Sequence, residues 1–208
     1  MRLILGPPGS GKTTLCLEKL REAVRVKRDN CRLIVPTATM GEHLRNELAR
    51  EGFVFKPALV STFTKFVEPY CIATPGVGSG AIEMIVAEVL ARTALTKYAA
   101  VRDFAGFRAS IVHIVEEFSS AGGSVDDLMR CGVEPDFIRI YTGVLAALKQ
   151  RNLNLRSAQL RQAAEKIAED GCPGVEDLIF TGFYSFTAPE LEVIRTLANR
   201  ARLTIALA

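Results

Sequence analysis

The fold is decided by the stretch Gly6-Pro7-Pro8-Gly9-Ser10-Gly11-Lys12-Thr13, which matches the pattern G-x-x-x-x-G-K-[ST] at every required position. It follows a short apolar run at residues 2–5 and opens residues 11–26, whose apolar side chains recur with helical spacing. Glycines let the backbone wrap closely around a phosphate, so that N–H groups and the positive end of the helix point at the anion. The sequence therefore predicts a strand, a phosphate-binding loop and a helix.

The ligand expected in this loop is a nucleoside triphosphate, with ATP and Mg²⁺ as the cofactors. Lys12 is expected to reach the β- and γ-phosphates, and the hydroxyl of Thr13 is expected to bind Mg²⁺. The predicted nucleotide-binding residues are Gly6, Pro8, Gly9, Ser10, Gly11, Lys12, Thr13 and Thr14. No residue is assigned a catalytic role.

Strand and helix patterns alternate on both sides of a long helical stretch. Further strands are predicted at residues 32–35, 58–61, 178–181 and 203–206, and further helices at 40–50, 62–70 and 189–200. This alternation favours a parallel sheet of about five strands covered by helices on both faces. We expect residues 1–73 and 174–208 to form this α/β core, and residues 74–173, which show only helical patterns, to form an inserted helical subdomain.

The composition excludes several classes of protein. With 49% hydrophobic and 24% charged residues among 208, the chain is unlike disordered, collagen-like or disulfide-scaffold proteins. It has no apolar run long enough for a membrane span and no signal-peptide pattern at its start, so we expect a cytoplasmic protein with no membrane partner. The five scattered cysteines lack a C-x-x-C pair and are expected to be reduced.

The net charge of +3 is unevenly distributed. Residues 1–70 hold twelve Lys or Arg against seven Asp or Glu, an excess of 12 − 7 = +5. This excess favours an anionic partner for the N-terminal third, and an ordinary solvated surface is the alternative.

Four segments together resemble the first motor domain of superfamily 1 DNA helicases of the UvrD/Rep kind. They are residues 3–14, 33–37, 60–66 and 178–190. The chain is most similar to the AddB-type subunit of bacterial ATP-dependent helicase–nuclease complexes, in which a GF-x-x-F-T-x-x-E string, here Gly182 to Glu190, replaces the acidic helicase signature. The resemblance implies a P-loop NTPase, RecA-like fold and an ATP-binding domain of a helicase–exonuclease subunit that acts in double-strand-break repair. It also implies a partner subunit and further C-terminal domains beyond residue 208.

The same resemblance implies a path for single-stranded DNA. Along it, hydroxyls and lysines meet phosphates, and aromatic rings stack on bases. The residues that match are Thr37, Thr62, Phe63, Lys65 and Phe66. For the two phenylalanines, spaced i, i+3 on a helix, a place in the core is an equal alternative.

The chain departs from working superfamily 1 ATPases at Thr181-Gly182, where those enzymes carry Asp-Glu to hold Mg²⁺ and orient the attacking water. Glu176 and Asp177 lie at the wrong end of the strand, and Glu190 lies on the next helix. We therefore expect hydrolysis by this chain alone to be weak or absent, which leaves its status as an enzyme open.

Three alternatives stay open from the sequence. The chain could be half of an active superfamily 1 helicase, a small-molecule P-loop kinase, or a scaffold with a vestigial loop. The first requires Thr181 to substitute for a carboxylate, the second requires an acceptor site, and the third requires that Mg-ATP does not bind.

Overall fold

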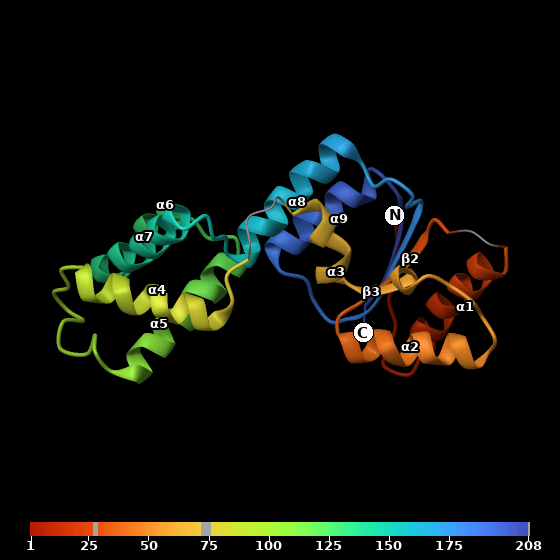
Figure 1. Cartoon of the computed structure of the whole chain (residues 1–208), viewed down its shortest axis with the longest axis horizontal. Coiled ribbons are helices and arrows are strands. Elements are labelled where there is room, and N and C mark those ends of the chain that lie inside the picture. Colours follow the sequence, from red (N-terminus) through yellow and green to blue (C-terminus); the bar gives the residue numbers. More distant parts are fainter. Residues whose placement is uncertain (27–28, 72–75, 208) are drawn as a thin grey trace. The chain divides into compact units, whose positions relative to one another are not determined.

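The computed structural model describes residues 1–26, 29–71 and 76–207, which form five strands with helices between them (Figure 1). The strands are β1 (Arg2–Ile4), β2 (Cys31–Val35), β3 (Val60–Thr62), β4 (Asp177–Phe183) and β5 (Arg202–Leu207). The helices are α1 (Lys12–Arg25), α2 (Ala38–Arg50), α3 (Phe63–Val67), α4 (Ser79–Arg92), α5 (Ala105–Ser120), α6 (Val125–Arg130), α7 (Pro135–Gln150), α8 (Arg156–Asp170) and α9 (Ala188–Ala198), with the 3₁₀ turns η1 (Pro57–Leu59) and η2 (Glu68–Tyr70). Among these helices, none in the described part of the chain is both long and apolar enough to cross a bilayer.

The five strands form one sheet in the order β1-β5-β4-β2-β3, and every neighbouring pair is parallel. The α/β class and the parallel sheet predicted from the sequence are thereby confirmed. Because all strands point the same way, their carboxyl ends meet at one edge. The loop at residues 6–11 leaves β1 at that edge, and Thr181 lies near the carboxyl end of β4.

Alternate residues of the strands are buried on opposite faces of the sheet. Leu33 and Val35 of β2 belong to a core cluster with Leu17 and Leu20 of α1 and Leu44 of α2. Each such buried side chain contributes about 1.5–3 kcal/mol to stability. Figure 1 shows α1 and α2 on one side of the sheet and α3 and α9 on the other.

The opposite face is rich in aromatic side chains. Phe180 of β4 is fully buried, and its ring lies 5.8 Å from that of Phe63 in α3 and 6.0 Å from that of Phe186. Ring pairs at this distance add about 0.5–1.5 kcal/mol beyond the area they bury. This cluster fixes the segment that follows β4.

The chain divides into two compact units. The first unit contains residues 1–71, 162–186 and 191–208, and the second contains residues 72–161 and 187–190. The predicted start of the insertion, residue 74, lies outside the described residues. The second unit has its own core, in which Val86, Val115, Ile140 and Val144 are fully buried.

A buried carboxylate organises one loop of the second unit. Asp136, near the start of α7, is fully buried, and its Oδ2 accepts hydrogen bonds from the backbone N–H groups of Thr96, Lys97 and Tyr98 at 2.7–3.0 Å. Arg139, one turn later, lies 3.3 Å from Oδ1. Asp136 therefore ties the loop before α5 to α7, and Arg139 adds a hydrogen bond to the carbonyl of Ala94 at 2.8 Å.

The helix predicted at residues 62–70 is shorter in the structure. It divides into α3 and η2, and Pro69 stands in the first turn of η2. Proline has no N–H group to continue an α-helix and disfavours helical geometry in the residue before it. The short α3 nevertheless keeps the two phenylalanines of the motif on one side.

Candidate nucleotide-binding site

The loop after β1 has the backbone of a phosphate cradle. Gly9 and Gly11 have φ angles of 77° and 80°, which other residues rarely adopt. A Cβ atom on Gly6 would lie 2.7 Å from the Oγ of Ser10, so a larger residue there would press on the loop. The backbone N–H of Ser10 donates to the carbonyl of Pro7 at 3.2 Å, which closes the turn. Successive residues in alternating right- and left-handed conformations direct N–H groups into one concavity, an arrangement that binds anions.

The amino end of α1 is left open for an anion. Gly11 caps it without a side-chain hydrogen bond, and its first turn holds no acidic residue. The unpaired N–H groups and the positive end of the helix dipole are therefore not neutralised by a neighbouring side chain. Both effects favour a phosphate at this position.

Lys12 is folded back onto the loop. Its Nζ donates hydrogen bonds to the carbonyl oxygens of Gly6 and Pro7, at 2.6 and 2.8 Å. Both carbonyls belong to exposed residues, so water can replace the ammonium group when it turns toward a phosphate. Within the described part of the chain, the hydrogen-bond partners of Lys12 are Gly6 and Pro7, which belong to the same loop.

A cavity of about 310 Å³ lies over the loop. It is lined by Pro8, Gly9, Ser10, Gly11, Lys12, Thr13, Thr14 and Tyr184. This volume is at the small end of the range for ligand pockets, about 300–1,000 Å³, and suits the phosphate end of a nucleotide. None of the described residues that line it carries a carboxylate.

The hydroxyls of Thr13 and Thr181 lie 3.3 Å apart, across 168 residues of sequence. Thr181 is 1% exposed and also approaches the thiol of Cys16. Burial raises the pKa of that thiol, and the hydrogen bond with Thr181 offsets part of the increase. The structure thus brings Thr13, the predicted Mg²⁺ ligand, against Thr181, the residue that the sequence comparison aligned with the aspartate of superfamily 1 ATPases.

These donors fit Mg²⁺ only in part. Mg²⁺ prefers six oxygen ligands and commonly keeps several waters. Thr13 and Thr181 offer two neutral hydroxyl oxygens, so nucleotide phosphates and water would have to provide most ligands and all the negative charge. We therefore expect the ion to bind together with a nucleotide and weakly without one.

A side chain at Gly182 would require a strained backbone and a shift of Met40. The φ angle of Gly182 is 81°, and a Cβ atom there would lie 2.9 Å from both Cε and Sδ of Met40 and 3.5 Å from Cδ of Pro36. The register of β4 against β5 also shifts between Thr181 and Phe183. The glutamate that working motors carry at this place cannot be accommodated without strain.

The acidic residues near β4 have other partners. Asp177 accepts two hydrogen bonds from the guanidinium of Arg202, at 2.6 and 2.8 Å. Glu190 accepts from the backbone N–H of Thr187 at 3.0 Å, and the hydroxyl of Thr187 accepts from the N–H of Glu190 at 3.4 Å. This reciprocal pair is a capping box at the start of α9. The T-x-x-E part of the motif is therefore a helix start.

Two of the predicted DNA-binding hydroxyls also cap helices. Thr37 accepts from the backbone N–H of Met40 at 3.2 Å, and Thr62 accepts from that of Lys65 at 3.3 Å. Val35 of β2 stands beside Thr62 of β3 in the sheet, so Thr62 and Thr37 follow the carboxyl ends of adjacent strands. Both lie on the edge of the sheet that carries the phosphate loop.

The three remaining predicted DNA contacts have different environments. Lys65 is exposed, and its Nζ lies 2.9 Å from Oε2 of Glu68. Phe63 and Phe66 are 3% and 8% exposed, because the i, i+3 spacing places both on the buried side of α3. Neither ring is free to stack on a base, and both occupy the core position considered as the alternative.

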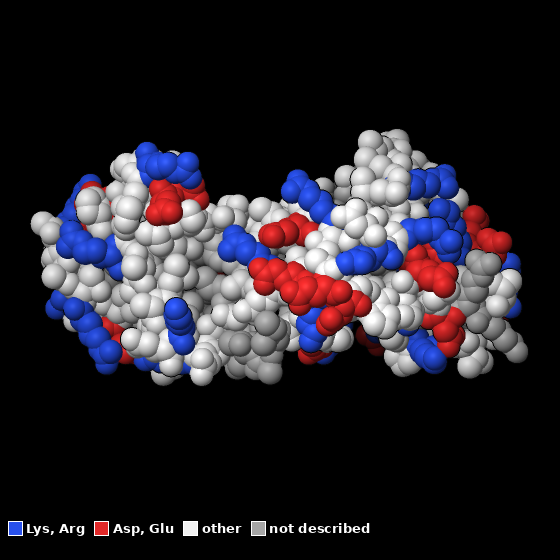
Figure 2. Space-filling view, turned by 90° about the horizontal axis from the view of Figure 1, so that it is seen from above, with Lys and Arg blue, Asp and Glu red and all other residues white. Residues whose placement is uncertain are grey.

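Much of the basic excess in the first 70 residues is paired with acidic side chains. Arg21 lies against Glu47 and Glu51, and Lys56 lies 2.6 Å from Asp29. On the face shown in Figure 2, basic and acidic side chains are interspersed. Anion binding at the loop therefore depends on its local geometry more than on a broad positive field.

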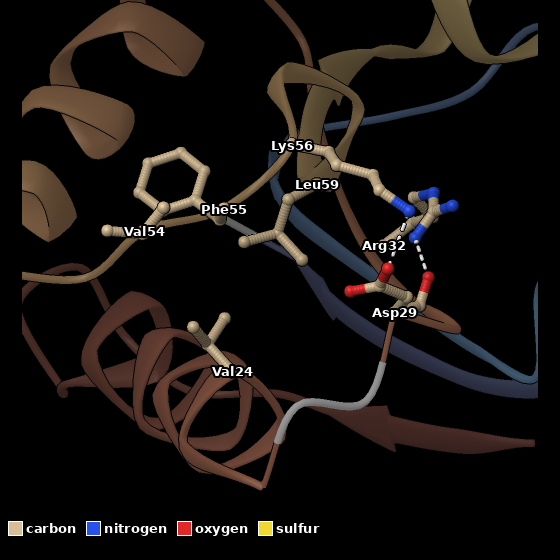
Figure 3. A pocket seen from close by; sticks show the side chains of 7 residues that line it. All are labelled: Val24, Asp29, Arg32, Val54, Phe55, Lys56 and Leu59. Carbon is tan, nitrogen blue, oxygen red and sulfur yellow. Dashed lines mark hydrogen bonds and ion pairs between the residues drawn. The ribbon is translucent and has the colours of Figure 1, made fainter.

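A second cavity, of about 410 Å³, lies at the amino ends of β2 and β3 (Figure 3). Its walls are formed by Val24, Asp29, Arg32, Val54, Phe55, Lys56 and Leu59. Lys56 donates to the carboxylate of Asp29 and Arg32 donates to its backbone carbonyl, at 2.6 and 2.5 Å. Because both cations are already engaged and the cavity is at the edge opposite the loop, the loop cavity is the better candidate for a phosphate ligand.

Sequence reasoning missed two features of the loop cavity. Tyr184, which is 84% exposed, lines it although 170 residues separate it from Thr14. The contact between Thr13 and Thr181 depends on how β1, β5 and β4 align in the sheet. The sequence signals were the place of Thr13 at the start of the predicted helix and that of Thr181 at the end of a predicted strand.

A family model described as "ADDB, N-terminal" matches residues 3–208 of the chain. A comparison with curated proteins found no match.

Proposed function

The chain belongs to the family of AddB N-terminal domains, and we propose that it is the ATP-binding N-terminal domain of an AddB-like subunit of an ATP-dependent DNA helicase–exonuclease. Such a subunit would work in double-strand-break repair in the cytoplasm, together with a partner helicase–nuclease subunit and C-terminal domains. Family membership supports the type of subunit, and the parallel sheet is consistent with a RecA-like P-loop core.

The observation that carries the nucleotide proposal is the loop at the carboxyl edge of the sheet. Glycines with positive φ, an uncapped helix start and Lys12 all face one cavity. In this proposal the backbone N–H groups of residues 9–13 hold the phosphates, and Lys12 turns from its two carbonyl partners to the β- and γ-phosphates. Thr13 supplies one oxygen to Mg²⁺, and Ser10 and Thr14 add hydroxyls at the rim.

Hydrolysis is expected to be weak or absent in this chain. Efficient cleavage needs a carboxylate that orients or deprotonates the attacking water and another that holds the metal. Thr181 offers a hydroxyl in one of these places, and Gly182, in the other, cannot be replaced by glutamate without strain. ATP would therefore act as a bound ligand that stabilises the domain.

Single-stranded DNA is the proposed second ligand. Thr37, Thr62 and Lys65 follow the ends of neighbouring strands, and phosphate contacts from such groups do not require aromatic stacking. Because Phe63 and Phe66 are buried, we expect DNA binding by this domain to depend on salt and to show little base preference.

The test is an equilibrium titration of the chain with Mg-ATP, Mg-ADP and single-stranded DNA, alongside Lys12→Ala. We expect Lys12→Ala to abolish measurable ATP binding because it removes the only cation that lines the described cavity. Lys149→Ala, an exposed lysine on α7 of the second unit, removes the same charge outside the loop and should bind ATP like the wild type. Equal ATP binding by wild type and Lys12→Ala would refute the assignment of the loop.

A further inference from the structure

We propose that Tyr184 is the residue that distinguishes a nucleoside triphosphate from a diphosphate in this site, by donating its phenolic hydrogen to the terminal phosphate. The inference rests on the proposed nucleotide function and adds to it a residue outside the phosphate loop. Its basis is that the exposed side chain of Tyr184 lines the same cavity as the seven consecutive loop residues from Pro8 to Thr14.

Tyr184 is held at the cavity by its buried neighbours. Phe183 is 7% exposed, and its ring stacks on that of Phe186 with centroids 4.8 Å apart. These rings anchor the chain on both sides of Tyr184, whose own side chain is 84% exposed. A large aromatic side chain that is exposed and lines a cavity is placed for a ligand and adds little to the core.

The β-bulge at Gly182, two residues before Tyr184, explains why Tyr184 lines the loop cavity. Gly182 has a φ angle of 81°, and the strand register shifts between Thr181 and Phe183. The bulge changes the alternation of side chains along β4. As a result, both Thr181 and Tyr184 approach the loop, Thr181 at Thr13 and Tyr184 over the cavity.

The contact between Thr13 and Thr181 indicates which end of a bound nucleotide would lie near Tyr184. In a phosphate loop of this type Thr13 would supply a hydroxyl oxygen to Mg²⁺ at the terminal phosphates of a bound nucleotide. Thr181 touches that hydroxyl, and Tyr184 follows three residues later on the same segment. The phenol is therefore on the side of the terminal phosphate.

The chemistry of the phenol suits recognition without cleavage. The phenolic O–H of Tyr184 is a hydrogen-bond donor. It can donate to a charged phosphate oxygen, an interaction stronger than a bond between neutral groups. A diphosphate leaves the phenol without this partner.

The test compares the affinities of wild type, Tyr184→Phe and Tyr184→Ala for Mg-ATP and Mg-ADP by equilibrium titration. We expect Tyr184→Phe to weaken ATP binding about tenfold and to change ADP binding by less than about twofold, because only ATP uses the hydroxyl. Tyr184→Ala should weaken ATP binding at least as much. Tyr98→Phe, which removes a phenolic hydroxyl in the second unit, should leave both affinities unchanged. Since Tyr184 is exposed, the Tm of each Tyr184 variant without nucleotide should equal that of the wild type.

The outcomes separate this inference from the proposed function. An unchanged ratio of ATP to ADP affinity in Tyr184→Phe overturns the role of the hydroxyl while the nucleotide function stands. Loss of both affinities in Tyr184→Ala alone, with Tyr184→Phe like wild type, also overturns it and assigns the ring a packing role. Failure of the wild type to bind either nucleotide overturns the proposed function, and this inference with it.

Discussion

Replacement of Gly182 by alanine tests whether the end of β4 has the geometry described above. Alanine in a left-handed conformation costs about 1–2 kcal/mol. Its Cβ would also lie 2.9 Å from Cε and Sδ of Met40. Overpacking of this kind costs about 1–3 kcal/mol, and the flexible methionine places it near the lower limit. We therefore expect Gly182→Ala to lower the free energy of unfolding of the first unit by about 2–3 kcal/mol, and Tm by about 4–12 °C.

The matched control is Gly52→Ala, which lies in the same unit. Gly52 has a φ angle of 86°, and a Cβ atom there would meet no atom within 4 Å. This variant should show the backbone penalty alone, about 1–2 kcal/mol. The difference between the two variants, about 1 kcal/mol, then measures the contact with Met40, and it should disappear when both are made in a Met40→Ala background.

The assay is equilibrium unfolding in urea followed by far-ultraviolet circular dichroism, with hydrogen exchange of the β4 amides to assign the transition to the first unit. If Gly182→Ala is no less stable than Gly52→Ala, the close approach of Met40 is wrong. If neither variant is destabilised, the argument from positive φ is wrong as well.

Three further predictions follow from single side chains. Thr181→Asp should lower the free energy of unfolding of the free protein by about 1–3 kcal/mol, because a carboxylate becomes buried beside Thr13. Mg-ATP should raise the Tm of this variant by more than it raises the Tm of the wild type. An equal or smaller increase would contradict the placement of Mg²⁺ at Thr13. Thr187→Ala should lower the free energy of unfolding in urea by about 1 kcal/mol, because α9 loses its cap. An unchanged urea concentration at the unfolding midpoint would show that the cap is unimportant. Burial by itself would raise the pKa of Asp136, but hydrogen bonds from three backbone N–H groups hold it below its ordinary value. The stability that its carboxylate contributes is thus complete above the unfolded-state pKa of about 3.9 and is lost as the pH falls through the lower folded-state pKa. Below about pH 4, Asp136→Asn should therefore lose less stability than the wild type or the exposed control Asp126→Asn. Equal slopes of the free energy of unfolding against pH in the three proteins would refute this.

The sequence predicted those features that depend on residues close together in the chain. The loop at residues 6–13 has local signals, namely a strand pattern, three glycines and a helical pattern, and all of them agree. The alternation of strands and helices predicted the parallel sheet because each element has its own local pattern of apolar residues. Helix ends were predicted less well, because Thr37 starts α2 earlier and Pro69 ends α3 sooner than the apolar spacing alone indicates.

Features that depend on sheet order could not be predicted. The contact between Thr13 and Thr181 requires β5 to pair with both β1 and β4. The place of Tyr184 in the loop cavity further requires the bulge at Gly182, which no pattern in the sequence revealed. The capping box at residues 187–190 is different, because its T-x-x-E spacing is a known helix start and could have been identified from the sequence.

The G-F-x-x-F-T-x-x-E motif can now be explained residue by residue without a catalytic acid. Gly182 adopts the positive φ of the β-bulge at the end of β4, Phe183 and Phe186 stack and anchor the segment, and Thr187 and Glu190 form the cap of α9. The motif thus fixes the segment that places Tyr184 over the phosphate loop. Because its one carboxylate is engaged in the cap, the groups it presents to the cavity are neutral donors. Neutral donors can hold a triphosphate but cannot deprotonate water at neutral pH, so we expect this domain to bind ATP and to hydrolyse it weakly or not at all.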